Sequence, residues 1–370
     1  MKSLHLRFLW RTALTLVVAF SPAVLVAQHY HQTNLVSDLP GKAKILDPHL
    51  KNPWGLSRAT DSPWWVSDNN SGFSTLYDGK GAIQSLVVTI PSDHAQSPTG
   101  SPTGTVFNGT DDFQLTPGNP ATAAIFLFVS EDGEISAWNP NVDQTHAKEK
   151  VHQSTKSVFK GATLAVDNGH DFLYVADFRQ GKILKYDTNF KQVPTLPGAF
   201  LDFVSQLGFA PFNIQNIGGN LYVGFAKQNA SKHDNLEGPG LGFVVAFDTK
   251  GSPLMFLEYG PWFNAPWGLA LAPSDFGAFS HKLLVGNFGS GEILAFNADT
   301  GRFEGKMVDK SGKTIRIDGL WALSFASGDA MSGSGPGNAL YFTAGINKEV
   351  DGLFGTLTAE PSDLIQGNGQ

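Results

Sequence analysis

The chain has 370 residues, with 26 basic and 33 acidic side chains, a formal charge of −7 and no cysteine. This acidic balance, without a basic cluster interleaved with aromatic residues, excludes nucleic acid as an expected partner. Since no disulfide can form, a large hydrophobic core must stabilise the fold, and a chain of this length can supply one.

Residues 1–27 predict a signal peptide. Basic residues precede an apolar stretch over residues 13–20, and a second apolar run ends at Ala27, where we expect cleavage. Ser21 and Pro22 interrupt the stretch, whereas a membrane span needs about 20 apolar residues. Removing the segment leaves 23 basic against 33 acidic residues, a formal charge of −10. We therefore expect a secreted or periplasmic mature chain with no membrane span.

A repeated strand pattern organises residues 28–360. Six short segments rich in aromatic and β-branched residues are typical of buried strands; they are residues 64–66, 126–128, 173–175, 221–223, 283–285 and 340–342. A turn and an alternating strand follow each of them, at residues 75–78, 135–139, 183–187, 244–248, 293–297 and, in degenerate form, 353–358. Repeats of about 40 to 50 residues predict a β-propeller.

A proline-x-glycine-apolar marker precedes several of these segments, as in Pro53-Trp54-Gly55-Leu56 and Pro266-Trp267-Gly268-Leu269, with weaker copies at residues 161–164 and 320–323. The order of marker, apolar strand, turn and aromatic-acid strand resembles the NHL repeat. The fold that follows is all-β, a six-bladed β-propeller of four-stranded blades. Residues 32–37 predict the outer strand of the last blade, which closes the ring, and residues 361–370 predict a polar tail.

Six stretches carry a further resemblance: residues 34–38, 52–56, 68–72, 102–108, 130–138 and 264–269. Through them the mature chain resembles an uncharacterised bacterial secreted family of NHL-like six-bladed propellers. Some members of that family end in a PEP-CTERM sorting tail, and it has relatives in giant viruses. This chain lacks the sorting tail, which favours a soluble product. The resemblance implies a fold and a compartment but no activity.

The loops from strand four to strand one and from strand two to strand three meet on one face of a propeller, where ligand sites usually lie. Their chemistry differs from blade to blade, which predicts a polar pocket, acidic on the side of blades one to three, where Glu131 and Asp132 lie, with Arg179 and Lys227 opposing it. We expect ligand contacts from Asn52, Trp54, Asp68, Asn69, Asp177, Arg179, Lys227, Asn264, Trp267, Asn287, Asp318, Trp321 and Asn347. The expected partner of this monomer is a small molecule, a glycan or a protein.

Carboxylate and amide oxygens are the ligands of which Ca²⁺ takes about six to eight. Asp68 and Asp177 are therefore candidate calcium ligands. The alternative, which we favour, is that each aspartate at the end of a second strand bonds the backbone of its own turn. The histidines nearest the strands are interpreted as surface residues; they are His170, His233 and His281.

Trp54, Trp267 and Trp321 occupy equivalent inner-strand positions, where they either bind a flat ligand in the channel or pack between blades, the interpretation that we favour. Three insertions are interpreted as solvated loops: residues 91–120, 228–240 and 326–337. The sequence contains no Gly-x-Ser-x-Gly motif and no phosphate-binding loop after a strand. We therefore expect a non-catalytic binding or scaffold protein, with a calcium-dependent lactonase-type hydrolase as the alternative.

Overall fold

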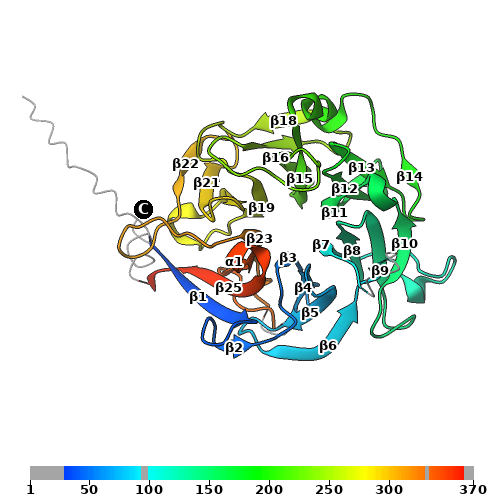
Figure 1. Ribbon diagram of the computed structural model, residues 1–370, viewed down its shortest axis with the longest axis horizontal. Helices are drawn as coiled ribbons and strands as arrows, with labels where there is room; N and C mark the ends of the chain where they lie inside the picture. The colour runs from blue at the N-terminus through cyan, green and yellow to red at the C-terminus, as the bar shows by residue number, and fades with distance from the viewer. Residues whose placement is uncertain (1–28, 93–98, 330–332, 362–370) are drawn as a thin grey trace, which may run out of the picture.

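A computed structural model describes residues 29–92, 99–329 and 333–361. Six sheets are arranged as blades around a central axis, which confirms the predicted six-bladed β-propeller (Figure 1). The predicted signal peptide and all but the first residue of the predicted tail lie outside the described residues. Over the described ranges, no helix is both long and apolar enough to cross a membrane.

Five blades consist of four antiparallel strands that follow one another from the axis to the rim. Blade one contains β3 (Pro53–Ser57), β4 (Trp64–Asp68), β5 (Phe73–Tyr77) and β6 (Ile83–Thr89). Blade two contains β7 (Pro102–Phe107), β8 (Phe126–Ser130), β9 (Glu134–Trp138) and β10 (Lys148–His152). Blade three contains β11 (Phe159–Asp167), β12 (His170–Asp177), β13 (Lys182–Tyr186) and β14 (Gln192–Val193). Blade four contains β15 (Phe209–Ile217), β16 (Asn220–Lys227), β17 (Gly242–Phe247) and β18 (Pro253–Phe256), and blade five contains β19 (Pro266–Leu271), β20 (Lys282–Asn287), β21 (Ile293–Asn297) and β22 (Phe303–Lys306).

Blade six combines strands that are far apart in the sequence. Its inner strands are β23 (Leu320–Phe325), β24 (Leu340–Gly345) and β25 (Asp351–Ala359), and its outer strand is β1 (Tyr30–Ser37), which runs antiparallel to β25. The two-residue strand β2 (Ile45–Leu46) pairs with β1 in parallel at the edge. The predicted closure by residues 32–37 is confirmed, and Figure 1 shows β1 in blue beside β25 in red.

Short helical segments lie in the connections between strands. They are η1 (Pro120–Thr122), η2 (Ser154–Lys156), η3 (Ala199–Leu207), η4 (Gly277–Phe279) and α1 (Ile346–Glu349). Of these, α1 bears on the site, because it joins β24 to β25 at the face where the inner strands begin.

The glycine of the inner-strand marker is required by the close approach of neighbouring blades. A Cβ atom added to Gly55 would clash with the backbone of Thr103 on the inner strand of blade two, and one added to Gly161 would clash with Asn213 on that of blade four. The six inner strands therefore lie side by side around the axis, with little room between their backbones. The marker is thus a packing requirement, since glycine is the residue that permits such contact.

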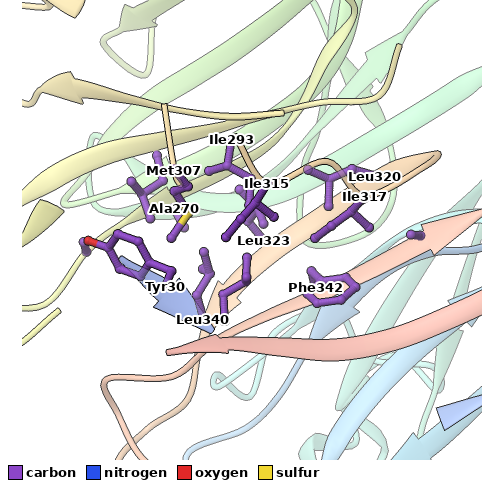
Figure 2. Packing of buried hydrophobic residues seen from close by; sticks show 14 of the residues in the cluster. Tyr30, Ala270, Ile293, Met307, Ile315, Ile317, Leu320, Leu323, Leu340 and Phe342 are labelled. Carbon is purple, nitrogen blue, oxygen red and sulfur yellow. The ribbon is translucent and has the colours of Figure 1, made fainter. Parts of the chain in front are cut away.

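Apolar side chains fill the space between adjacent blades, and Tyr30 of β1 extends this core across the closure (Figure 2). Its ring is 1% exposed, and it stacks on Phe279 at a centroid distance of 5.7 Å. The Tyr30 hydroxyl donates to the Phe276 carbonyl (3.0 Å) and accepts from the Phe279 N–H (3.1 Å). A single side chain of the closing strand therefore fastens blade six to blade five.

Replacing Tyr30 by alanine should lower the free energy of unfolding by about 3–5 kcal/mol, because a fully buried aromatic ring is removed and two backbone groups lose their partner. The exposed neighbour Thr33 serves as the control, and Thr33→Ala should change stability by less than about 1 kcal/mol. Urea denaturation of both variants measures the difference. Equal midpoints for the two variants would show that the Tyr30 side chain does not fasten blade six to blade five.

Candidate functional site

In each blade, the pairing of the inner strand with the second strand shifts in register at one point. One side chain of the inner strand lies at that point. These residues are Trp54, Thr103, Lys160, Phe212, Trp267 and Trp321. The four aromatic rings touch across the axis, although they come from blades one, four, five and six. Trp54 stacks on Trp321 with centroids 3.4 Å apart, and Trp267 meets these two rings edge-on at 6.2 and 5.9 Å.

We call Trp54, Phe212, Trp267 and Trp321 the aromatic plug. The three tryptophans are at most 4% exposed, and the Phe212 ring lies 5.7 Å from Trp321. The rings fill the axis and offer no open face, so these predicted ligand contacts lie inside the packed centre of the ring. The aromatic plug also separates the two ends of the axis from each other.

Lys160 of blade three occupies the position that holds tryptophan in blades one, five and six. Its side chain is 2% exposed, and its Nζ lies 4.9 Å from the centroid of the Trp54 ring. Nζ forms an ion pair with Glu131 Oε1 and lies 3.6 Å from Asp234 Oδ1. A buried ammonium group is costly unless it is paired, so these carboxylates and the ring face hold the cation at the axis.

Polar side chains from several blades surround Lys160 at the end of the axis where the inner strands begin. We call Asn52, Asn69, Glu131, Lys160, His233, Asp234 and Glu349 the acidic mouth. Asn52 Nδ2 donates to Glu349 Oε2 (3.1 Å), and Asn69 Nδ2 donates to Glu131 Oε2 (3.0 Å). Asn52 Oδ1 accepts from Trp321 Nε1 (3.0 Å). The two asparagines, both predicted from the sequence, thus link the aromatic plug to the carboxylates.

Glu349 reaches the acidic mouth from a strained turn. Asn347, Lys348 and Glu349 are three successive residues in the left-handed region, with φ values of 55°, 59° and 66°. Such backbone costs energy for residues other than glycine and often marks functional sites. Burial raises the pKa of Glu349 and the nearby Glu131 carboxylate raises it further, although the bond from Asn52 acts in the opposite direction. Glu349 therefore holds its proton more firmly than an ordinary glutamate.

Asp234 and His233 reach the acidic mouth on the insertion at residues 228–240. The Asn229 N–H donates to the Asp234 carbonyl (2.8 Å), and Asn229 Oδ1 accepts from the His233 N–H (3.2 Å). His233 Nδ1 lies 2.7 Å from Asp234 Oδ1, and this bond lowers the pKa of Asp234 to about 2. The solvated-loop interpretation is therefore incomplete here, and His233, with its side chain 39% exposed, is a component of the site.

Asp68 and Asp177 bond within their own blades. The Thr75 hydroxyl donates to Asp68 Oδ2 (2.7 Å), and the Gln180 N–H donates to Asp177 Oδ1 (3.1 Å). Burial raises the pKa of both carboxyl groups, which disfavours the ionised form that a metal ion requires. Asp177 thus bonds the backbone of its own turn, as the favoured interpretation has it, whereas Asp68 bonds a hydroxyl group on the neighbouring strand β5.

Arg179 and Lys227, which were predicted to oppose the acidic side, bond to nearby backbone oxygens. Arg179 Nη1 donates to the Thr155 carbonyl (2.5 Å), and Lys227 Nζ donates to the Leu207 carbonyl (2.6 Å). Both cations are thus held at local backbone oxygens. The cation that faces the carboxylates is Lys160 instead.

The remaining predicted residues brace the loops around the acidic mouth. The Asn264 N–H donates to Asn287 Oδ1 (3.0 Å), and Asn264 Oδ1 accepts from the Gly238 N–H (2.7 Å), which fixes the insertion that carries Asp234. Asp318 Oδ2 accepts from the Asn347 N–H (3.0 Å) at the strained turn. Their contribution to the site is therefore to position its loops.

Two groups of side chains in the described part of the chain lie close enough to share a metal ion: Glu131, His233 and Asp234, and, on β9 and β10, Glu134, Glu149 and His152. In the first group, Lys160 Nζ lies within ion-pair distance of both Glu131 and Asp234. The ammonium group thus occupies the place between these two carboxylates that a calcium ion would need. The residues of the acidic mouth therefore fit an internal ammonium group and do not fit a calcium ion.

Lys160 was not among the predicted site residues, although the sequence contains a signal for it. Gly161 aligns with the marker glycines, so Lys160 stands where blade one carries Trp54. A lysine at such a core position is anomalous in any repeat and demands a buried partner. Asp234 and Glu349 gave no comparable signal, because they lie on an insertion and on an irregular turn outside the repeat.

No family model matches the chain. Two uncharacterised proteins of Acanthamoeba polyphaga mimivirus, R648 and L690, are each 31% identical to it. The match to R648 covers 87% of this chain and 78% of that protein, and the match to L690 covers 88% and 85%.

Solved propeller enzymes share the architecture. Virginiamycin B lyase from Staphylococcus aureus superimposes with a TM-score of 0.51 at 13% identity, over 90% of this chain and 99% of that one. The PQQ-bound aldose sugar dehydrogenase from Streptomyces coelicolor gives a TM-score of 0.52 at 14% identity, over 90% and 98%. At this level of identity the likeness shows the fold alone.

Replacing Lys160 by methionine removes the ammonium group and keeps an unbranched side chain. The variant should lose about 3 kcal/mol of unfolding free energy, because the largely buried carboxylate of Glu131 loses its partner. Millimolar calcium chloride should then raise the melting temperature of the variant, since the ion can take the place of the ammonium group, and leave the native chain unchanged.

Lys185→Met is the matched control, because it breaks another partly buried pair, with Asp167, away from the axis. Calcium should not restore the stability of this control. If calcium stabilises the native chain as much as Lys160→Met, the acidic mouth binds the metal beside Lys160, and the internal-cation account is wrong.

Proposed function

Since the chain belongs to the same family as the mimivirus proteins R648 and L690, whose names assign no activity, we propose its function from the geometry of the acidic mouth. The chain is a non-catalytic binding protein, and its ligand is a small molecule that carries an ammonium group. The observation that carries this proposal is an excess of negative charge: carboxylates from blades two, four and six converge on a single lysine.

Glu349 gives the acidic mouth a place for a second cation. Burial is the main cause of its raised pKa, and Lys160, which is already paired with Glu131, offsets this effect only in part. A ligand ammonium group beside Glu349 replaces its proton and supplies a counter-charge. Gln228 adds a neutral acceptor near this end of the axis: it is 7% exposed, and its Oε1 has no hydrogen-bond partner among the described residues.

A metal-dependent hydrolase is a weaker candidate for this site. Its chemistry needs an ion that polarises a carbonyl or phosphoryl oxygen, and Lys160 supplies the positive charge at the point where such an ion would contact Glu131 and Asp234. Binding without catalysis requires only the charge and the fixed geometry that the acidic mouth supplies.

We also propose that the chain is exported and cleaved after Ala27, on the basis of its basic and apolar leader. Expression of the full chain in a bacterial host, followed by mass spectrometry of the periplasmic and medium fractions, tests this. A mature product that begins at Gln28 is the expected result, and an uncleaved cytoplasmic chain would contradict the proposal.

Putrescine and 1,4-butanediol are matched probes, because they differ only in carrying ammonium or hydroxyl groups. Isothermal titration calorimetry should show putrescine binding at least about tenfold more tightly, since a charged group strengthens each hydrogen bond by more than about 1 kcal/mol. Putrescine affinity should rise as pH increases through the raised pKa of Glu349, because the carboxyl group must lose its proton to pair with the ligand.

Glu349→Gln should weaken putrescine binding about tenfold and remove this pH dependence, while the amide oxygen still accepts from Asn52. Asp299→Asn removes the same charge from an exposed turn of blade five and should leave the affinity unchanged. Equal binding of the diamine and the diol would refute the proposed ligand class, and an equal loss in both variants would show a diffuse charge effect instead of a site.

A further inference from the structure

A cavity of about 440 Å³ opens at the other end of the axis, where the inner strands end. Its walls come from β3, β7, β11, β15 and β23. A narrow extension of about 30 Å³ shares Thr105, Ala162 and Gln215 with it and reaches Trp267 of the aromatic plug. The aromatic plug therefore forms the floor of this cavity and separates it from the acidic mouth. Its volume lies in the range of small-molecule sites.

Hydroxyl groups line the walls of this cavity. Thr105 is 8% exposed, and its Oγ1 has no hydrogen-bond partner in the described part of the chain. Ser57 Oγ accepts from the Phe107 N–H (3.1 Å), and Thr163 Oγ1 accepts from the Asn216 N–H (3.1 Å). Because each of these two hydroxyls accepts from the backbone, its own hydrogen remains available to donate. Buried hydroxyl groups without a partner are costly, so Thr105 marks a place that a ligand completes.

Arg58 alone carries a charge among the described residues that line this cavity. Its Nε and Nη2 donate to the Phe325 carbonyl (3.3 and 3.1 Å), which fixes the guanidinium plane. A guanidinium has five N–H donors and suits a carboxylate, and three of them are used by backbone oxygens here. The wall thus combines a fixed cation with neutral hydroxyl donors, in contrast to the acidic mouth.

From this arrangement we infer a second binding site, which takes a monosaccharide-sized hydroxylated carboxylic acid. The carboxylate pairs with Arg58 at the rim, and the ligand hydroxyl groups accept from Ser57 and Thr163 and bond to Thr105 deeper in the cavity. This site is independent of the proposed function at the acidic mouth, because the aromatic plug lies between them.

Glucuronate and glucose are the probes, since they share a ring and differ in the carboxylate. Isothermal titration calorimetry should show glucuronate binding at least tenfold more tightly than glucose. Arg58→Met should abolish this preference. Thr105→Val, which keeps the shape of the side chain, should weaken glucuronate binding about three- to tenfold.

Thr105→Val also separates a binding role from a structural one. It should leave the melting temperature of the free chain unchanged or raise it, because it removes a buried hydroxyl without a partner. Arg179→Met, a loss of positive charge at the opposite face, is the control and should leave glucuronate affinity intact. The inference is overturned if neither sugar binds at millimolar concentration, or if Arg58→Met and Thr105→Val bind glucuronate as the native chain does. Each of these outcomes leaves the putrescine result unaffected.

Discussion

Six inner strands bring one side chain each toward a common axis, and a packed interior tolerates few voids. Aromatic rings from blades one, four, five and six meet this constraint by stacking across the axis, which ties together blades that are not neighbours. Because the rings fill the centre, the propeller has two separate ends instead of a continuous channel. The acidic mouth and the cavity at the other end of the axis therefore lie on opposite sides of the aromatic plug.

Lys160 is the one cation among the six side chains at the axis, and it determines which groups surround the axis at the acidic mouth. A tryptophan at that position would have completed an apolar core, whereas a lysine needs carboxylate partners within reach. Those partners come from a turn in blade two and from the insertion at residues 228–240, and Glu349 lies close by on a strained turn. The loops of the acidic mouth are thus organised around a charge that the ring itself places at the axis.

The sequence predicted the second and third strands of every blade, because their apolar alternation repeats at a regular spacing. It also predicted the closing strand, since the last repeat lacked one. Its success at the site was partial. Asn52 and Asn69 were identified from their place beside the inner and second strands, but Asp234 and Glu349 depend on loop conformations outside the repeat. Asp68 and Asp177 were candidate calcium ligands, but their bonds lie within their own blades, which agrees better with the favoured structural interpretation.

The pairing of β1 with β25 brings residues 30–37 against residues 353–359. Contacts between segments this distant in sequence carry a large loop-closure entropy and are typical of slow folding. As the chain emerges N-terminus first, five blades can form in order, but blade six stays incomplete until β25 has emerged. Until then β1 has an unpaired edge, which is a template for association with other chains. The fold therefore places its greatest risk of aggregation at the start of synthesis and removes it at the end.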